Sequence, residues 1–85
     1  MNNLTFNLSK SMENKEGPTF WGWTEEDHRP HYFTVYEDFY KTLLEENDGD
    51  YTAADVAAIG YALRTRGYDT TNLIIKVEGE TIYEN

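Results

Sequence analysis

Residues 52–67 read TAADVAAIGYALRTRG, and this stretch decides the fold class. Thr52 and Asp55 have the spacing of a capping box, in which two side chains satisfy the first free N–H groups of a helix. The apolar positions recur at helical spacing and form one inner stripe: Val56, Ile59, Gly60 and Leu63. Two arginines in the last turn, followed by Gly67, favour a helix end. The stretch predicts an amphipathic helix over about 53–66.

A second helix is predicted just upstream, over about 35–46. Thr34 and Glu37 again have capping-box spacing. The apolar stripe repeats every fourth residue and is widened by its neighbours: Val35, Phe39 and Leu43, then Tyr36, Tyr40 and Leu44. Residues 47–50, NDGD, end the helix because Asn and Gly tolerate left-handed backbone angles. The connection of about six residues favours an antiparallel pair of helices.

Strands are predicted on both sides of the helices. Four segments have the alternation or the composition of strands: residues 4–8, 19–24, 73–77 and 81–83. Residues 9–18 and 25–31 are polar and predict loops, and Glu78-Gly79 predicts a tight turn. The resulting order, β-β-α-α-β-β, is typical of an α+β fold in which two helices pack on one face of a small, mostly antiparallel sheet.

Length and composition restrict the class of protein. With 85 residues the chain has room for a single domain, residues 1–85. It has no cysteine, which excludes disulfides, thiolate metal sites and a cysteine nucleophile. The start lacks the pattern of a secretory signal, and no apolar run approaches the roughly 20 residues that span a bilayer. A net charge of −9 opposes binding to nucleic acid and to anionic membranes. We therefore expect a cytoplasmic protein. The sequence does not specify its oligomeric state.

Aromatic residues replace aliphatic ones in the expected core. Leu, Ile, Val and Phe make up only one fifth of the chain, which approaches the composition of disordered proteins. Aromatic residues make up 15%, however, and each buried ring removes roughly 150–250 Å² from water. On the strand at 19–24, Trp21 and Trp23 share one face, and Phe20 and Gly22 share the other. The simplest interpretation places both tryptophans in the core, together with Tyr32, Tyr36 and Tyr40, which recur every fourth residue, whereas an exposed tryptophan would be an interface anchor.

Most of the acidic residues are concentrated in one segment. Ten of the 16 lie between positions 25 and 55, where only Arg29 and Lys41 oppose them. They are Glu25, Glu26, Asp27, Glu37, Asp38, Glu45, Glu46, Asp48, Asp50 and Asp55. Such a segment attracts a basic surface from a distance. Carboxylates one helical turn apart lie about 5–6 Å from one another, which is comparable with phosphates along a nucleic-acid strand.

These acids suggest a protein that occupies the nucleic-acid-binding surface of another protein. In general character the chain resembles small acidic inhibitors of nucleases, such as phage or mobile-element proteins that act against restriction or CRISPR systems. The partner would be a nuclease or another nucleic-acid-binding protein, in the host cytoplasm if the chain is phage-encoded. The candidate partner-binding residues are the first nine of these acids, from Glu25 to Asp50, together with Trp21 and Trp23. The alternative is an interaction module that binds through an aromatic or sheet-edge surface, while the acids provide solubility.

Two further patterns fit metal sites poorly. Residues 47–55 are similar to an EF-hand or dockerin loop, but aligning Gly49 with the sixth loop position puts Leu44, which cannot bind calcium, at the first. A degenerate calcium-binding module is the third alternative. His28 and His31 are interpreted as surface histidines of a loop, because zinc usually takes three or four ligands.

No pattern distinguishes a catalytic group. Ser9 and Ser11 lack the context of a nucleophile elbow, and the chain has no Gly-rich phosphate loop. A core this small also leaves little room for a pocket of roughly 300 Å³ or more. The sequence therefore predicts neither an enzyme nor a cofactor.

Overall fold

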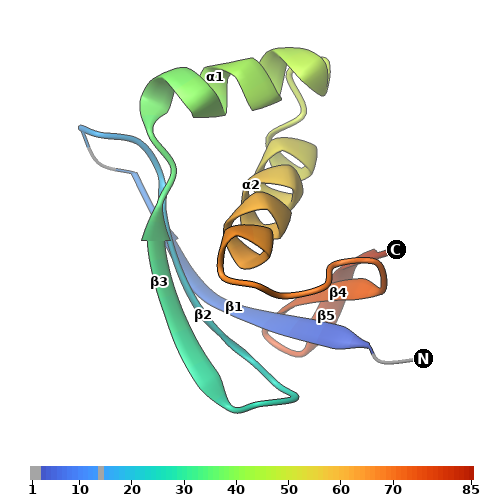
Figure 1. Ribbon diagram of the computed structural model, residues 1–85. Coiled ribbons are helices and arrows are strands. Elements are labelled where there is room, and N and C mark those ends of the chain that lie inside the picture. Colours follow the sequence, from blue (N-terminus) through green and yellow to red (C-terminus); the bar gives the residue numbers. More distant parts are fainter. Residues whose placement is uncertain (1–2, 14) are drawn as a thin grey trace.

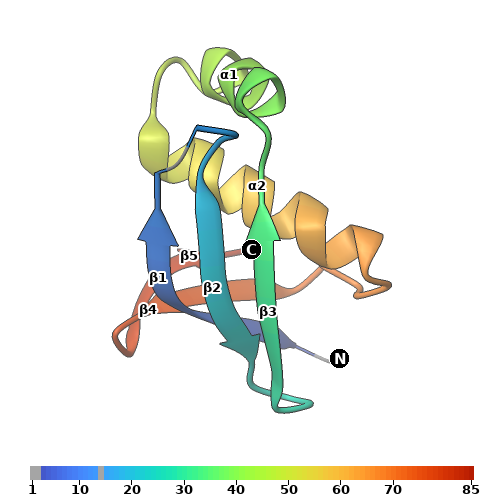
Figure 2. The same ribbon diagram turned by 90° about the vertical axis from the view of Figure 1, so that its left-hand side faces the viewer.

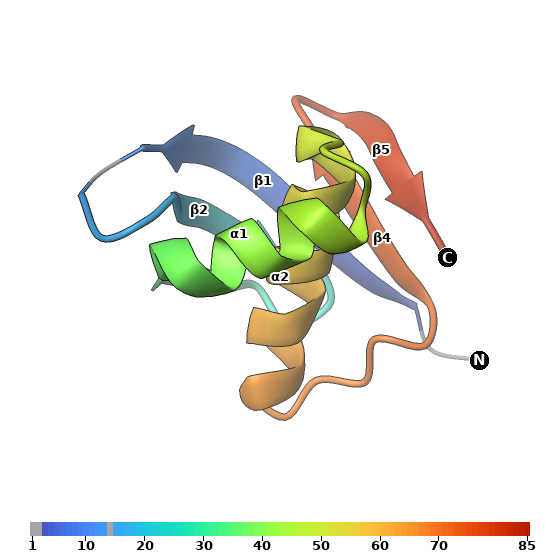
Figure 3. The ribbon, with the colours of Figure 1, turned by 90° about the horizontal axis from the view of Figure 1, so that it is seen from above.

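The computed structural model describes residues 3–13 and 15–85, which form five strands and two helices (Figure 1). The elements are β1 Leu4–Met12, β2 Thr19–Thr24, β3 Arg29–Thr34, α1 Glu37–Glu46, α2 Tyr51–Thr65, β4 Leu73–Val77 and β5 Glu80–Glu84. The strands make one curved sheet, α2 lies against its concave side, and α1 lies across α2 (Figures 1 and 3). The predicted α+β class is confirmed, although the strand order differs in part.

The sheet is mixed, whereas a mostly antiparallel one was expected. Its order is β3-β2-β1-β4-β5, and β1 pairs with β4 in parallel while the other neighbours are antiparallel. The chain leaves β3 at one edge, passes through both helices and returns beside β1. A crossover of this kind is what a parallel pair needs. Phe6 and Ile75 face each other in this central pair, and both are fully buried.

The N-terminal half of the sheet holds one strand that the sequence does not predict and one that is longer than predicted, whereas β2 has the predicted bounds. The polar segment 25–31 is not wholly a loop, because residues 29–34 form β3, in which His31 and Phe33 point inward. Pro30 disfavours a strand, but on an edge strand its missing N–H breaks no ladder. β1 likewise runs to Met12 across a bulge between residues 8 and 10, because β2 pairs alongside it.

α1 begins later than expected and packs differently. Its N-cap is Tyr36, which makes no side-chain capping bond, while Thr34 ends β3 and shares a 2.9 Å hydrogen bond with Thr19. The predicted Thr34–Glu37 capping box is therefore wrong, because strand pairing takes Thr34. None of the α1 residues is fully buried. Figure 3 shows α1 crossing over α2 rather than lying antiparallel beside it.

α2 confirms the predicted long helix to within two residues. Its N-cap, however, is Asp50, whose carboxylate accepts a 3.2 Å hydrogen bond from the backbone N–H of Ala53, so the assignment of Thr52 is wrong. Its buried side faces the sheet and consists of Ala54, Ala58, Ile59, Gly60, Ala62 and Leu63. Gly67 follows with a φ of 90°, which is the left-handed conformation expected beyond a helix end.

Phenylalanines, and not tryptophans, supply the aromatic part of the core. Phe6 and Phe20 are fully buried, and the Phe33 ring lies 6.2 Å from the first and 5.6 Å from the second. The Phe6 ring occupies the space beside Gly22, where a Cβ atom would lie 2.5 Å from Cζ of that ring. The aliphatic members of the core are Leu4, Val35, Ile59, Leu63, Leu73 and Ile75.

The C-terminal hairpin agrees with the sequence. β4 has the predicted bounds, β5 extends the predicted strand by one residue at each end, and the turn lies at Glu78 and Gly79. Both turn residues have positive φ values, 53° and 82°, which suit the twist of a two-residue hairpin. Within the described residues, neither helix is long and apolar enough to cross a bilayer.

Candidate partner-binding surface

Three aromatic side chains, Trp21, Trp23 and Tyr32, lie exposed on the side of the sheet away from α2, and we call them the aromatic face. Their exposed fractions are 49%, 38% and 59%. Figure 2 looks onto this side of β1, β2 and β3, with α2 behind the sheet. The interpretation of both tryptophans as core residues is therefore wrong, because the strand turns Phe20 inward and the tryptophans outward.

Strand pairing holds the rings in place. Tyr32 on β3 lies opposite Trp21 on β2, and Pro30 lies opposite Trp23. The Trp21 and Tyr32 ring centroids are 5.7 Å apart with an interplanar angle of 72°. This edge-to-face arrangement is favourable for two aromatic rings. Trp21 and Tyr32 therefore support each other across the two strands.

Exposing these rings forgoes stability that a small core needs. Burying a large apolar side chain is worth roughly 1.5–3 kcal/mol, and the chain contains only two tryptophans. Both lie at outward positions of the same strand. Tryptophan and tyrosine are also the residues that most often dominate the energy of protein interfaces. The placement therefore favours a role in binding.

The acids of the β2–β3 turn are largely engaged within the fold. Oε1 of Glu26 accepts a 2.7 Å hydrogen bond from the backbone N–H of Thr5. Asp27 accepts hydrogen bonds from the hydroxyls of Thr24 and Tyr68. The Glu25 side chain is exposed at the same turn. Of the three predicted binding acids in this turn, Glu25 alone is a purely surface group in the described contacts.

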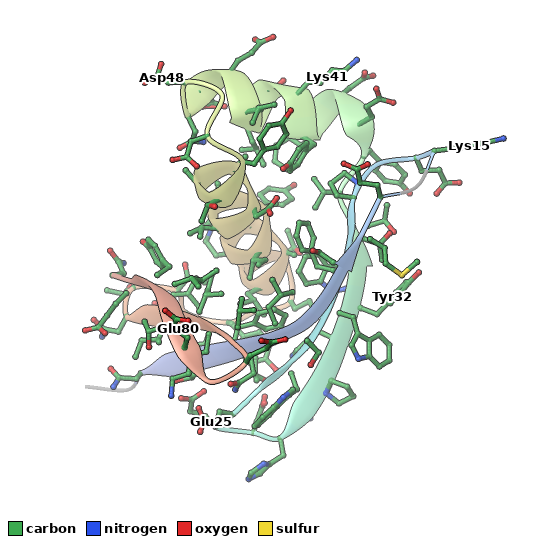
Figure 4. The ribbon with its side chains drawn as sticks, turned by 180° about the vertical axis from the view of Figure 1, so that it is seen from behind. Lys15, Glu25, Tyr32, Lys41, Asp48 and Glu80 are labelled. Carbon is green, nitrogen blue, oxygen red and sulfur yellow. The ribbon has the colours of Figure 1, made fainter. Side chains whose placement is uncertain are left out.

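The remaining predicted acids lie on or just after α1. Glu37 forms a 3.1 Å ion pair with Lys41, and Asp50 caps α2. The other four are Asp38, Glu45, Glu46 and Asp48, and all are exposed. In Figure 4, Asp48 and Lys41 lie at one end of the molecule, Glu25 at the other, and Tyr32 between them. The structure thus divides the acidic segment into two groups at opposite ends of the molecule.

A polar cluster that sequence reasoning missed lies beneath the β2–β3 hairpin. Nε2 of buried His31 lies 3.1 Å from Oγ1 of Thr24 and 3.2 Å from Oη of Tyr68. Both hydroxyls donate to Asp27, the tyrosine at 2.5 Å. Because their protons are directed to the carboxylate, we assign the proton of a neutral His31 to Nε2. The hydrogen bond from Tyr68 to Asp27 connects the segment after α2 to the β2–β3 hairpin, across 41 residues of sequence.

The surroundings of this cluster favour a neutral His31 and an ionised Asp27. Burial, aided by the charge of Arg66, lowers the pKa of His31, although Asp27 acts in the opposite direction. Burial would raise the pKa of Asp27, but the hydrogen bonds from Thr24 and Tyr68 outweigh it and hold that pKa below its ordinary value. His31 is thus a buried member of a network, which corrects its interpretation as a surface residue. His28 lies in the turn and is exposed.

The edge beside β3 is protected against strand addition. Pro30 has no N–H to offer a further strand. The carbonyl of Tyr32 accepts a 3.1 Å hydrogen bond from Nη2 of Arg66. These are the devices by which natural proteins block an exposed edge. The described contacts therefore favour the aromatic face over this sheet edge as a binding surface.

Comparisons of the chain with known protein families, with curated proteins and with solved structures found no match. The function is therefore inferred from the residues and surfaces of this chain alone.

The calcium alternative gains no support from the connection between the helices. Asp50 is engaged as the N-cap of α2, and Asp55 accepts a 2.7 Å hydrogen bond from the hydroxyl of Tyr40. The backbone N–H of Gly49 closes the turn on the carbonyl of Leu44 at 2.8 Å. Across residues 3–13 and 15–85 no three His, Cys, Asp or Glu side chains gather closely enough to hold a metal ion.

Proposed function

We propose that this chain is a non-catalytic binding protein that docks on a basic, nucleic-acid-binding surface of another protein. The observation that carries the proposal is the joint exposure of Trp21, Trp23 and Tyr32 on the helix-free side of the sheet. Rigid, partly exposed rings at the centre of a surface are the usual anchors of a protein interface. The aromatic face is the anchor of the proposed complex.

The charge of the chain specifies the chemistry of the partner. Exposed acids lie at both ends of the molecule, Glu25 at the β2–β3 turn and Asp38, Glu45, Glu46 and Asp48 on or just after α1. The net charge of −9 steers the chain toward a basic surface. Arginine fits both the rings and the acids, because it stacks on aromatic rings and forms paired hydrogen bonds with carboxylates.

Basic surfaces rich in arginine are those that hold phosphates, so binding would exclude nucleic acid from the partner. The specific form of this proposal is an inhibitor of a nuclease, of the anti-CRISPR or anti-restriction type, encoded by a phage or mobile element. The support is the acidity, the small size and the exposed rings. In the alternative form the aromatic face binds a partner without basic character, and the acids provide solubility alone.

Affinity capture from a nuclease-treated host lysate, followed by elution with rising salt, tests the proposal. The expected result is a nucleic-acid-binding protein that elutes at intermediate salt and is displaced by added duplex DNA or RNA. Trp21→Thr and Trp23→Thr should each weaken the interaction by about thirtyfold, as expected for anchor residues. Tyr51→Gln is the matched control, because Tyr51 is also exposed but lies on α2.

Charge variants separate the two forms of the proposal. Glu45→Gln, Glu46→Gln and Asp48→Asn together remove three exposed acids, whereas Glu26, Asp27 and Asp50 are left intact because they hold the fold. Loss of affinity in the triple variant supports binding to a basic surface. Retained affinity, with no salt dependence and no displacement by nucleic acid, overturns it in favour of a partner without basic character. Retained affinity in both tryptophan variants would show that the aromatic face does not bind the partner.

A further inference from the structure

A second surface feature lies on the helical side of the sheet, away from the aromatic face. A groove of about 630 Å³ is lined by residues of β3, the start of α1 and the second half of α2. Those three elements can be followed in Figure 1. The sequence analysis expects little room for a pocket of roughly 300 Å³ or more, and this expectation is wrong, because the groove is larger. The groove lies between β3, the start of α1 and the second half of α2, and Figure 3 shows α1 crossing over α2.

The walls of the groove are mostly aromatic. Phe33 comes from β3, Tyr36 and Phe39 from the start of α1, and Tyr61 from α2. The Phe39 and Tyr61 rings pack together with centroids 4.8 Å apart. These two side chains remain 37% and 48% exposed, so the groove is open to solvent. Walls of this kind suit a flat apolar ligand.

Arg66 is the only charged side chain among the residues that line the groove. Its guanidinium lies 5.1 Å from the centroid of the Phe33 ring and donates hydrogen bonds to the carbonyls of Tyr32 and Ala62. The guanidinium is therefore held in place by a ring face and by neutral backbone groups. Arginine has five N–H donors, so several remain for a ligand.

Among the described residues no carboxylate forms an ion pair with Arg66, although the chain has 16 acids and 7 bases. Lys41, by contrast, forms an ion pair with Glu37 at 3.1 Å. An ordered guanidinium beside an apolar groove is complementary to an anion with an apolar body.

We propose that this groove binds a small molecule that combines a flat apolar body with one carboxylate, and that the carboxylate pairs with Arg66. The volume lies within the range of small-molecule sites, about 300–1,000 Å³. The aromatic walls contact the apolar body, and the guanidinium fixes its orientation through paired hydrogen bonds. The inference does not depend on the proposed function, because the groove and the aromatic face share no side chain.

Titration of the intact chain with 2-naphthoate, followed by heteronuclear NMR, tests the proposal. We expect shift changes confined to the groove residues and to the side-chain NH of Arg66. The neutral isostere 2-naphthalenemethanol should bind at least about tenfold more weakly, because it cannot form the charge-assisted pair. A salt concentration of 0.15 M screens the repulsion between the anion and the acidic chain.

Two variants locate the pairing group. Arg66→Met keeps an apolar stem on Phe33 and should weaken 2-naphthoate binding about tenfold while leaving 2-naphthalenemethanol unchanged. Arg64→Met removes the same charge from the same helix, but Arg64 lies outside this groove, so affinity should stay within about twofold.

Three results would overturn the proposal. They are the absence of shift changes at millimolar 2-naphthoate, equal affinity for the acid and the alcohol, and equal losses in the two arginine variants. The comparison of acid with alcohol uses the unmodified chain, so the test stands even if Arg66→Met perturbs folding.

Discussion

The hydroxyl of Tyr40 donates a 2.7 Å hydrogen bond to Oδ1 of Asp55, and this bond joins α1 to α2. Since α1 has no fully buried residue, we expect the bond to contribute to its docking. Tyr40→Phe leaves the half-buried carboxylate without this donor and should lower the free energy of unfolding by about 1–3 kcal/mol. Urea denaturation at neutral pH measures the loss. Tyr36→Phe is the control, because Tyr36 is exposed, and equal stabilities of the two variants would contradict the prediction.

The same carboxyl gives a pH-dependent prediction. Burial raises the pKa of Asp55, although the bond from Tyr40 acts in the opposite direction. The folded state thus binds this proton more tightly than the unfolded state, and the contribution of Asp55 to stability falls as pH rises through the folded-state pKa. Asp55→Asn keeps an acceptor for Tyr40 and removes the buried charge. Its stability relative to the parent should therefore be higher at about pH 7 than at about pH 3 in urea denaturation. An identical difference at both pH values would refute this.

His31 should respond to pH with the opposite sign. Its pKa is lowered from 6.5 by burial and by Arg66, against the opposing effect of Asp27, and Arg29 adds to the lowering. The unfolded state therefore takes up the proton first, and stability is lost as pH falls below 6.5 toward the folded-state pKa. His31→Gln should flatten the dependence of the urea midpoint between about pH 8 and pH 5. His28→Asn, in the exposed turn, should keep the slope of the parent.

Local patterns were sufficient for the elements whose signals lie within one segment. The stripe of α2, the composition of β4 and the Glu78-Gly79 turn each predict what the structure contains. β3 could not be found in this way, because its strand character depends on pairing with β2, and Pro30 obscures it. The two helix starts were displaced for a related reason. Thr34 is taken by strand pairing with Thr19, and Asp50 precedes Thr52 as the capping residue of α2.

The candidate surface was predictable only in part. The alternation along β2 places Trp21 and Trp23 on one face, but it does not indicate which face α2 covers. The acids lie in one segment of the sequence, residues 25–55, yet the β2–β3 turn and α1, which carry them, lie at opposite ends of the molecule. Contacts such as Tyr68 with Asp27, 41 residues apart, are invisible without the fold. Contacts between residues far apart in the sequence, and not local propensity, therefore determine which face is exposed and where the acids lie.

Gly22 should be intolerant of any side chain. A Cβ atom there would lie 2.4 Å from the carbonyl oxygen of Asn7 and 2.5 Å from Cζ of Phe6. Because both groups belong to the central strand β1, neither moves without disturbing the core. Gly22→Ala should cost about 1–3 kcal/mol of stability, the usual effect of overpacking. Gly49→Asn is the control, since the space around Gly49 is open and Asn tolerates its φ of 79°. Urea midpoints of the two variants compare them, and a smaller loss at Gly22 would contradict the packing argument.

The exposure of the aromatic face predicts that its tryptophans contribute little to folding. Trp21→Thr and Trp23→Thr should each lower the free energy of unfolding by only about 1–2 kcal/mol, because threonine suits a strand and the rings are already partly solvated. Phe20→Ala on the same strand should cost about 3–5 kcal/mol, because Phe20 is fully buried. Thermal and urea denaturation of the three variants measure the contrast. Losses at Trp21 or Trp23 as large as at Phe20 would make these rings structural, and the proposed function would then lose the observation that carries it. Small losses combined with lost partner binding would assign the two tryptophans to recognition.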